Sequence, residues 1–319
     1  MEYTAPRLEW FRKDRTPPMP YRLTASDKDL TRALRRIARQ QIDRAIAAID
    51  AETGETLAET IHDVRKRAKK LRGLLRLVRP ALPAYAKENA TLRDAARRLS
   101  ALRDRGALIE AYDRLLDHYA DDTARAPFAS LRGALTRDQN QIAADPATFD
   151  ELSRFRDRLL RVRDRTAAWR LTEKDRRAIA LGVAKTYGRA VIASGAAGHA
   201  PDAAALHEWR KRAKYHRYHV SLMAPVWPAE LENRLVLVKR LEDILGEHRD
   251  LTLLSAAASD MSRPLDISAR ATFTGFAERR QAEIIAEAGP LSGRLFAESP
   301  EALTDRWTAW HKLWRRETA

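Results

Sequence analysis

The sequence has no cysteine and only 12 glycines among its 319 residues. The absence of cysteine excludes a disulfide framework, a cysteine-ligated zinc or iron–sulfur site and a cysteine nucleophile. No run of about 18 apolar residues occurs, so the sequence predicts no membrane-spanning helix. The N-terminus lacks the apolar core of a signal peptide, and we therefore expect a cytoplasmic protein.

Acidic residues are in deficit, with 44 Asp and Glu against 59 Lys and Arg, and the formal net charge is +15. A protein this basic usually meets a polyanion such as a nucleic acid, an anionic membrane or a phosphate polymer. Net charge does not determine the fold, but the rest of the composition indicates it. Ala, Leu, Arg and Glu dominate, and these residues favour helices, so we predict an all-α protein.

The first 22 residues contain prolines at positions 6, 17, 18 and 20, which exclude a continuous helix. We predict an extended arm over residues 1–22, attached to the body by Trp10, Phe11 and Tyr21. From residue 23 onward the pattern predicts successive helices. The first begins at an N-cap at Ser26, the second runs from Leu57 to just before Pro80, and the third lies between residues 83 and 105.

One segment of the sequence occurs twice. Residues 61–83 read IHDVRKRAKKLRGLLRLVRPALP, and residues 206–228 read LHEWRKRAKYHRYHVSLMAPVWP. They align without a gap at an offset of 145 residues (207 minus 62), and LSALRD ending at Asp104 resembles LGEHRD ending at Asp250. Because internal repeats reveal architecture, we predict two similar helical bundles, residues 23–169 and 170–319, related by a pseudo-twofold axis.

Each copy of the repeated helix presents cations on one face. The first stripe comprises His62, Arg65, Lys66, Lys69, Arg72 and Arg76. The second stripe comprises His207, Arg210, Lys211, Lys214, Arg217 and Tyr218, and it is shorter because Ser221 stands where Arg76 stood. Like charges four residues apart destabilise a helix by about 0.2–0.5 kcal/mol per pair, so we expect an anion to neutralise both stripes across a basic central groove.

Further matched residues could extend the groove. Arg93 matches Lys239, and Arg103 matches Arg249. Arg103 and Arg249 each precede an aspartate, and they either pair with an acid or reach the groove. The histidines that open the stripes could donate a hydrogen bond to a phosphate oxygen or serve as capping and packing residues. No local set of Asp, Glu and His completes a metal site, and we expect no metal and no other cofactor.

The paired His-x-x-Arg-Lys-Arg runs and the later Arg-Asp pairs resemble the CHAD family, the conserved histidine α-helical domain. The resemblance covers about residues 23–316 and identifies residues 23–319 as a CHAD domain. It implies two helical bundles around a basic channel that binds inorganic polyphosphate, and association with polyphosphate granules. Some relatives add a triphosphate-hydrolysing tunnel domain with an E-x-E-x-K strand, a motif that this sequence lacks.

We therefore predict a non-enzymatic protein that binds polyphosphate, with other granule proteins as further partners. A nucleic-acid-binding protein is the alternative, because charge alone does not separate two polyanions, but the sequence shows no helix-turn-helix, zinc-finger or RNA-recognition signature. A phosphohydrolase built on His62 and Asp63 is the third interpretation. Against it, Glu208 replaces Asp63 in the second copy, and the sequence has no P-loop.

Overall fold

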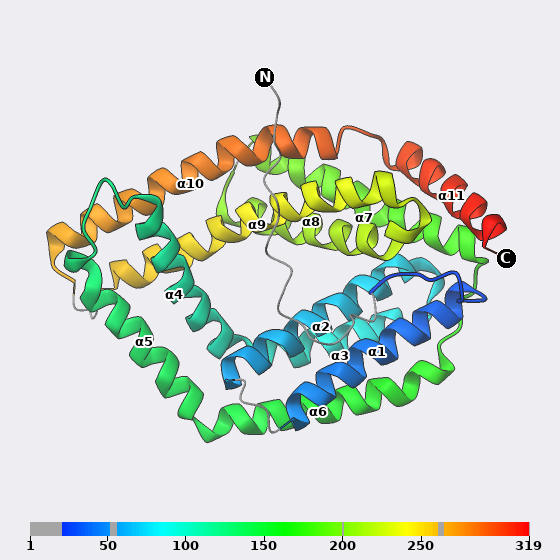
Figure 1. Cartoon of the computed structure of the whole chain (residues 1–319), viewed down its shortest axis with the longest axis horizontal. Coiled ribbons are helices and arrows are strands. Elements are labelled where there is room, and N and C mark those ends of the chain that lie inside the picture. Colours follow the sequence, from blue (N-terminus) through cyan, green and yellow to red (C-terminus); the bar gives the residue numbers. More distant parts are fainter. Residues whose placement is uncertain (1–20, 52–55, 200, 261–264, 319) are drawn as a thin grey trace.

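The computed structural model describes residues 21–51, 56–199, 201–260 and 265–318, with the backbone alone for residues 100–105. Within these ranges every regular element is a helix, which confirms the predicted all-α class (Figure 1). Most of the predicted N-terminal arm, including Trp10 and Phe11, lies outside them. None of the described helices is long and apolar enough to cross a bilayer.

The two predicted halves follow a similar order of helices. The first half contains α1 (Leu30–Asp50), α2 (Leu57–Leu77), η1 (Arg79–Ala81), α3 (Tyr85–Arg98), α4 (Ser100–His118), η2 (Ala126–Phe128), α5 (Ala129–Ala144), α6 (Pro146–Arg165) and η3 (Thr166–Ala168). The second half contains α7 (Asp175–His199), α8 (Ala203–Met223), η4 (Ala224–Val226), α9 (Pro228–Ser259), α10 (Ile267–Leu295) and α11 (Pro300–Glu317). The long helix α9 takes the place of α3 and α4 together.

The helices that carry the stripes, α2 and α8, have well-defined starts. The backbone N–H of Thr56 donates to the Glu59 carboxylate at 2.8 Å, and the Thr56 hydroxyl accepts from the Glu59 N–H at 3.3 Å. This capping box satisfies backbone donors at the start of α2. At the start of α8, the Asp202 carboxylate accepts from the backbone N–H of Ala205 at 2.7 Å. The predicted bounds of α2 are confirmed.

Two predicted helix bounds are wrong. The first helix is capped by Asp29, whose carboxylate accepts from the Arg32 N–H at 2.8 Å, and it begins four residues after Ser26. The third helix ends at Arg98 rather than near residue 105, because the backbone leaves helical geometry at Leu99 (φ −90°, ψ 18°), and the next helix begins at Ser100. Leu99 is an ordinary helix former, so its type gives no local signal of the break.

Helices α2 and α8 pack against each other at the centre of the molecule. Gly73 of α2 faces Tyr218 of α8 so closely that a Cβ at Gly73 would lie 2.6 Å from Tyr218 Cδ2. These positions match in the sequence repeat (218 minus 73 is 145), so equivalent points of the two helices are in contact. Backbone bonds from Leu23 N to the Leu222 carbonyl and from Thr172 N to the Ala81 carbonyl also join the halves. These contacts favour the pseudo-twofold relation, which stays a prediction.

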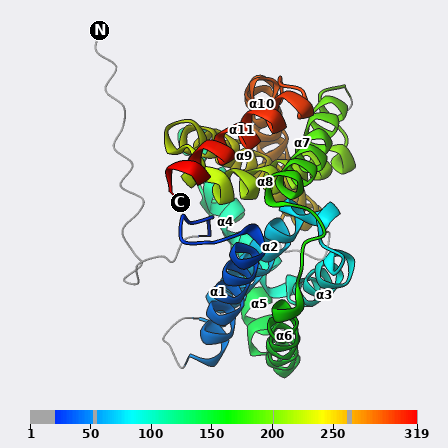
Figure 2. The same ribbon diagram turned by 90° about the vertical axis from the view of Figure 1, so that its right-hand side faces the viewer.

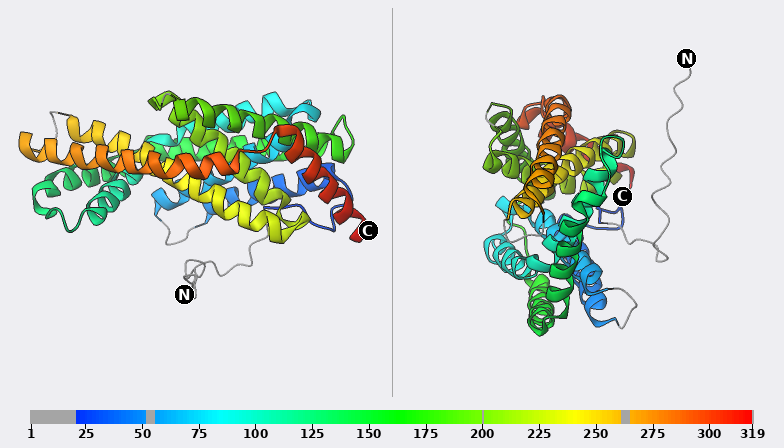
Figure 3. Two further views of the ribbon diagram at one scale, coloured as in Figure 1. Left: turned by 90° about the horizontal axis from the view of Figure 1, so that it is seen from above. Right: turned by 90° about the vertical axis from the view of Figure 1, so that its left-hand side faces the viewer.

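The remaining helices form two layers around this crossing. In Figure 2, α7 to α11 lie above α1, α2, α3 and α6. Helices α9 and α10 run side by side along the long axis of the molecule (Figure 3). Helix α4 of the first half packs against α9 of the second half, so both halves share one continuous core of buried side chains. This arrangement encloses one end of the stripe-bearing helices between α4 and α9.

Candidate functional site

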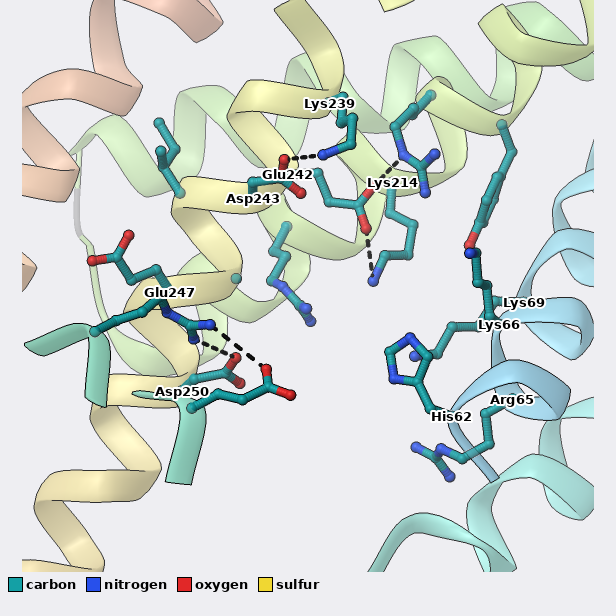
Figure 4. A pocket seen from close by; sticks show the side chains of 17 residues that line it. His62, Arg65, Lys66, Lys69, Lys214, Lys239, Glu242, Asp243, Glu247 and Asp250 are labelled. Carbon is teal, nitrogen blue, oxygen red and sulfur yellow. Dashed lines mark hydrogen bonds and ion pairs between the residues drawn. The ribbon is translucent and has the colours of Figure 1, made fainter. Parts of the chain in front are cut away.

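A cavity of about 570 Å³ lies where α2, α4, α8 and α9 meet (Figure 4). Its lining comprises His62, Arg65, Lys66 and Lys69 of α2, Glu110 and Arg114 of α4, Arg210, Lys214, Arg217 and Tyr218 of α8, and Lys239, Glu242, Asp243, Ile244, Gly246, Glu247 and Asp250 of α9. Both stripes thus face one cavity, although they are 145 residues apart in the sequence.

The cavity brings together nine of the predicted site residues: His62, Arg65, Lys66, Lys69, Arg210, Lys214, Arg217, Tyr218 and Lys239. Their distribution follows from helical periodicity, because residues three and four apart share a face of α2 or α8. Gly246 has no side chain and allows the Arg210 guanidinium to approach α9. A Cβ there would lie 3.3 Å from Arg210 Nε. That these residues bind a ligand stays a prediction.

The C-terminal end of the first stripe does not reach the cavity. Arg72 Nε donates to Asn89 Oδ1 at 3.2 Å, which directs it towards α3. Arg76 is buried, donates to the Arg72 carbonyl at 2.9 Å, and stacks 3.7 Å from the ring centroid of Tyr215. The physical reason is the packing of this end of α2, where α8 crosses at Gly73 and Gly182 of α7 approaches the Leu77 carbonyl.

Four further predicted residues lie outside the cavity lining. Arg93 is exposed and pairs with Asp94 at 2.8 Å, His207 is exposed at the start of α8, and Lys211 forms an ion pair with Glu208. Arg249 Nη1 lies 3.4 Å from Asp250 Oδ1, the ion-pair alternative that the sequence left open. The side chain of Arg103 lies outside the part of the chain whose side chains are described.

An acidic wall on α9 is the feature that sequence reasoning missed. Asp243, Glu247 and Asp250 face the cavity together with Glu242. A signal for it exists, because positions 243, 247 and 250 follow the i, i+4, i+7 spacing of one helix face. Several of these acids pair with cations: Asp243 with Lys239, and Glu247 with Arg280, whose Nε lies 2.7 Å from the carboxylate.

Glu242 reaches further than the other acids and contacts the second stripe. Its Oε1 lies 2.9 Å from Lys214 Nζ, and its Oε2 accepts from Arg217 Nε. Burial alone would raise the pKa of Glu242, but Lys214 and Arg217 outweigh it and lower that pKa. Burial lowers the pKa of Lys214, with Glu242 opposing the shift. The result is a triad in the cavity wall, in which the buried Glu242 pairs with the half-buried Lys214 and Arg217.

Burial and neighbouring positive charge also lower the pKa values of two groups outside the cavity lining. Burial, followed by the neighbouring Lys66 and Arg67, lowers the pKa of Lys70 to about 8. Burial, then Lys211 and Arg249, lowers the pKa of His207. A nearby anion would oppose both shifts, because an opposite charge favours the protonated form.

The His62-Asp63 pair does not form a catalytic dyad directed at the cavity. Asp63 Oδ2 accepts from Arg67 Nε at 2.5 Å on the same helix, and Asp63 is not part of the cavity lining. Among the described residues, no group of three or more His, Asp or Glu side chains is arranged to hold a metal ion.

This architecture is similar to that of known proteins. The CHAD domain model matches residues 8–82 and 36–259, and no curated protein matches the chain. The crystal structure of the CHAD domain from the plant Ricinus communis is 17% identical, with a TM-score of 0.55, and the match covers 88% of this chain and 98% of that one. PptA from Streptomyces chartreusis is 16% identical, with a TM-score of 0.61 and coverage of 85% and 100%. At such identities the likeness shows the fold alone. Because the domain model matches well over half of its residues, this chain belongs to the CHAD domain family.

Proposed function

We propose that this protein binds inorganic polyphosphate, or a polyanion of similar charge density, in the cavity between α2 and α8. The observation that carries the proposal is that cations of both stripes line one cavity. Membership of the CHAD family supports it, since the resemblance implies a polyphosphate-binding channel. The lining holds eight Lys and Arg side chains and five Asp and Glu side chains, an excess of three positive charges.

The chemistry of the lining suits a chain of phosphates. An arginine such as Arg65 or Arg210 can donate two parallel hydrogen bonds to phosphate oxygens, while Lys66 and Lys69 act as compact point charges. Binding releases counterions from the polymer, so affinity falls with salt. For single-stranded nucleic acids the slope of log K against log salt is about −0.7 per neutralised phosphate, and we expect a comparable value here.

A charge-matched pair of variants tests the site. Replacing Arg65, Lys69, Arg210 and Lys214 together by Ala removes two cations from each stripe and should abolish polyphosphate binding. The control replaces four exposed cations outside the cavity lining, Arg97, Arg154, Arg177 and Arg240, by Ala. Both variants lose four positive charges, so their polyphosphate binding should differ only if the ligand binds in the cavity.

Calorimetric titration with long-chain polyphosphate measures both variants, and circular dichroism checks that helicity is retained. The site predicts no binding by the cavity variant and near wild-type binding by the control. Equal losses in the two variants would show that net charge, rather than this cavity, governs binding.

We further propose that binding is non-catalytic and that it occurs at polyphosphate granules, where other granule proteins are partners. Incubation with polyphosphate and Mg²⁺ should release no phosphate above the level of a protein-free control. A fluorescent fusion should co-localise with polyphosphate staining, and the cavity variant should not. Release that depends on His62 would replace this view with an enzymatic one.

A further inference from the structure

The second stripe contacts a carboxylate that has no counterpart at the first stripe. Glu242 lies between Lys214 and Arg217 in the cavity wall, and Figure 4 shows its carboxylate directed at Lys214. The Glu242 and Lys214 side chains are only 11% and 13% exposed, so the ion pair is largely removed from water. A charge pair in such surroundings is screened far less than one on the surface.

The first half has no acid at the corresponding position. Arg103 matches Arg249 at an offset of 146 residues (249 minus 103), and at this offset Glu242 corresponds to Ala96. Ala96 is buried, and its backbone carbonyl accepts a hydrogen bond from Arg65 of the first stripe. The acid is therefore a feature of the second half alone.

We propose that Glu242 is a built-in competitor for the ligand, whose carboxylate occupies the place that a phosphate would take between Lys214 and Arg217. The inference rests on the proposed function. An incoming phosphate must displace this carboxylate before it can bind both cations, so Glu242 sets the affinity of the second stripe. The carboxylate is tethered, and its effective concentration exceeds that of a free anion.

Glu242→Gln removes the charge and keeps the size of the side chain. We expect this variant to bind long-chain polyphosphate about tenfold more tightly, at the low end of the coupling measured for close charge pairs. Without ligand it should unfold at a lower temperature, because Lys214 and Arg217 lose their counter-charge. Polyphosphate should then raise its unfolding temperature by more than it raises that of the wild type.

Asp243→Asn is the matched control. It removes the same charge from the same cavity, but Asp243 forms its ion pair with the exposed Lys239 and acts on Arg217 only as a weaker, more distant charge than Glu242. We expect a gain of less than about threefold, as for exposed pairs. Lys214→Ala, alone and combined with Glu242→Gln, completes the design. Because Glu242→Gln also releases Arg217, the gain should be smaller, but not absent, in the Lys214→Ala background.

Calorimetric titrations of these variants decide between the outcomes. Binding by the wild type without a gain in Glu242→Gln, an equal gain in Asp243→Asn, or an undiminished gain in the Lys214→Ala background would each overturn the inference. Absence of binding by both the wild type and Glu242→Gln would instead overturn the proposed function. If Glu242→Gln does not fold, Glu242→Asp, which keeps the charge on a shorter side chain, should give a smaller gain of the same sign.

Discussion

Gly182 lies where α7 of the second half meets the C-terminal end of α2. A Cβ added at Gly182 would lie 1.7 Å from the Leu77 carbonyl oxygen and 2.4 Å from its carbon. Both atoms belong to the backbone, so rotation of a side chain cannot relieve the clash. Gly182→Ala must therefore move α7 and α2 apart, and with them the end of the stripe-bearing helix.

The magnitude follows from two opposing effects. Overpacking a close contact costs about 1–3 kcal/mol, and a backbone contact belongs at the upper end of that range. Alanine in place of glycine within a helix returns about 1 kcal/mol. We expect a net destabilisation of about 2 kcal/mol, which lowers the melting temperature by roughly 3 °C, because the unfolding entropy of a chain of 319 residues is large.

Thermal unfolding followed by circular dichroism measures the effect. Gly275→Ala in α10 is the control, because a Cβ there meets nothing within 4 Å. That variant should gain about 1 kcal/mol of stability and melt higher than the wild type. If Gly182→Ala were as stable as Gly275→Ala, α7 would not approach Leu77 as the structure describes, and the packing of the halves would need revision.

Two further predictions concern buried charge. Burial lowers the pKa of His219 to about 3, whereas the unfolded chain protonates near pH 6.5, so stability is complete above that pH and falls below it. Between pH 7 and pH 5 His219 should cost about 2 kcal/mol, and urea unfolding of His219→Leu at both pH values should show a pH difference smaller by that amount. The buried Glu88 accepts two hydrogen bonds from Arg165 at 2.7 Å, and Glu88→Ala should lower the free energy of unfolding by about 3 kcal/mol. An unchanged urea midpoint would show that this pair contributes nothing.

Local sequence patterns predict the fold class and the parts of the site that depend on one helix. The spacing of cations and apolar residues in α2 needs no knowledge of other helices, because periodicity alone determines which residues share a face. The same applies to α8. The spacing therefore places His62 and Lys66 on one face of α2, and Lys214 and the other cations of the second stripe on one face of α8. The repeat in turn relates the two helices to each other, because matched segments are expected to occupy matched positions.

The parts that sequence does not predict depend on packing between helices. The position at which α8 crosses α2 is a tertiary property. Arg72 and Arg76 therefore continue the first stripe in the sequence but do not line the cavity. The ion pair between Glu242 and Lys214 joins α9 to α8 and has no local signature. Comparing the halves for charges present in one copy only would include Glu242, which corresponds to Ala96, but also Glu247, which corresponds to Ala101, so the comparison alone does not identify the ion pair.

Calorimetric titration with long-chain polyphosphate at two salt concentrations, with single- and double-stranded DNA at equal charge as competitors, tests whether polyphosphate is the ligand of this cavity. We expect tight polyphosphate binding that weakens as salt rises and that DNA does not displace. Equal or tighter binding of DNA would contradict this expectation and make nucleic acid the ligand of this cavity.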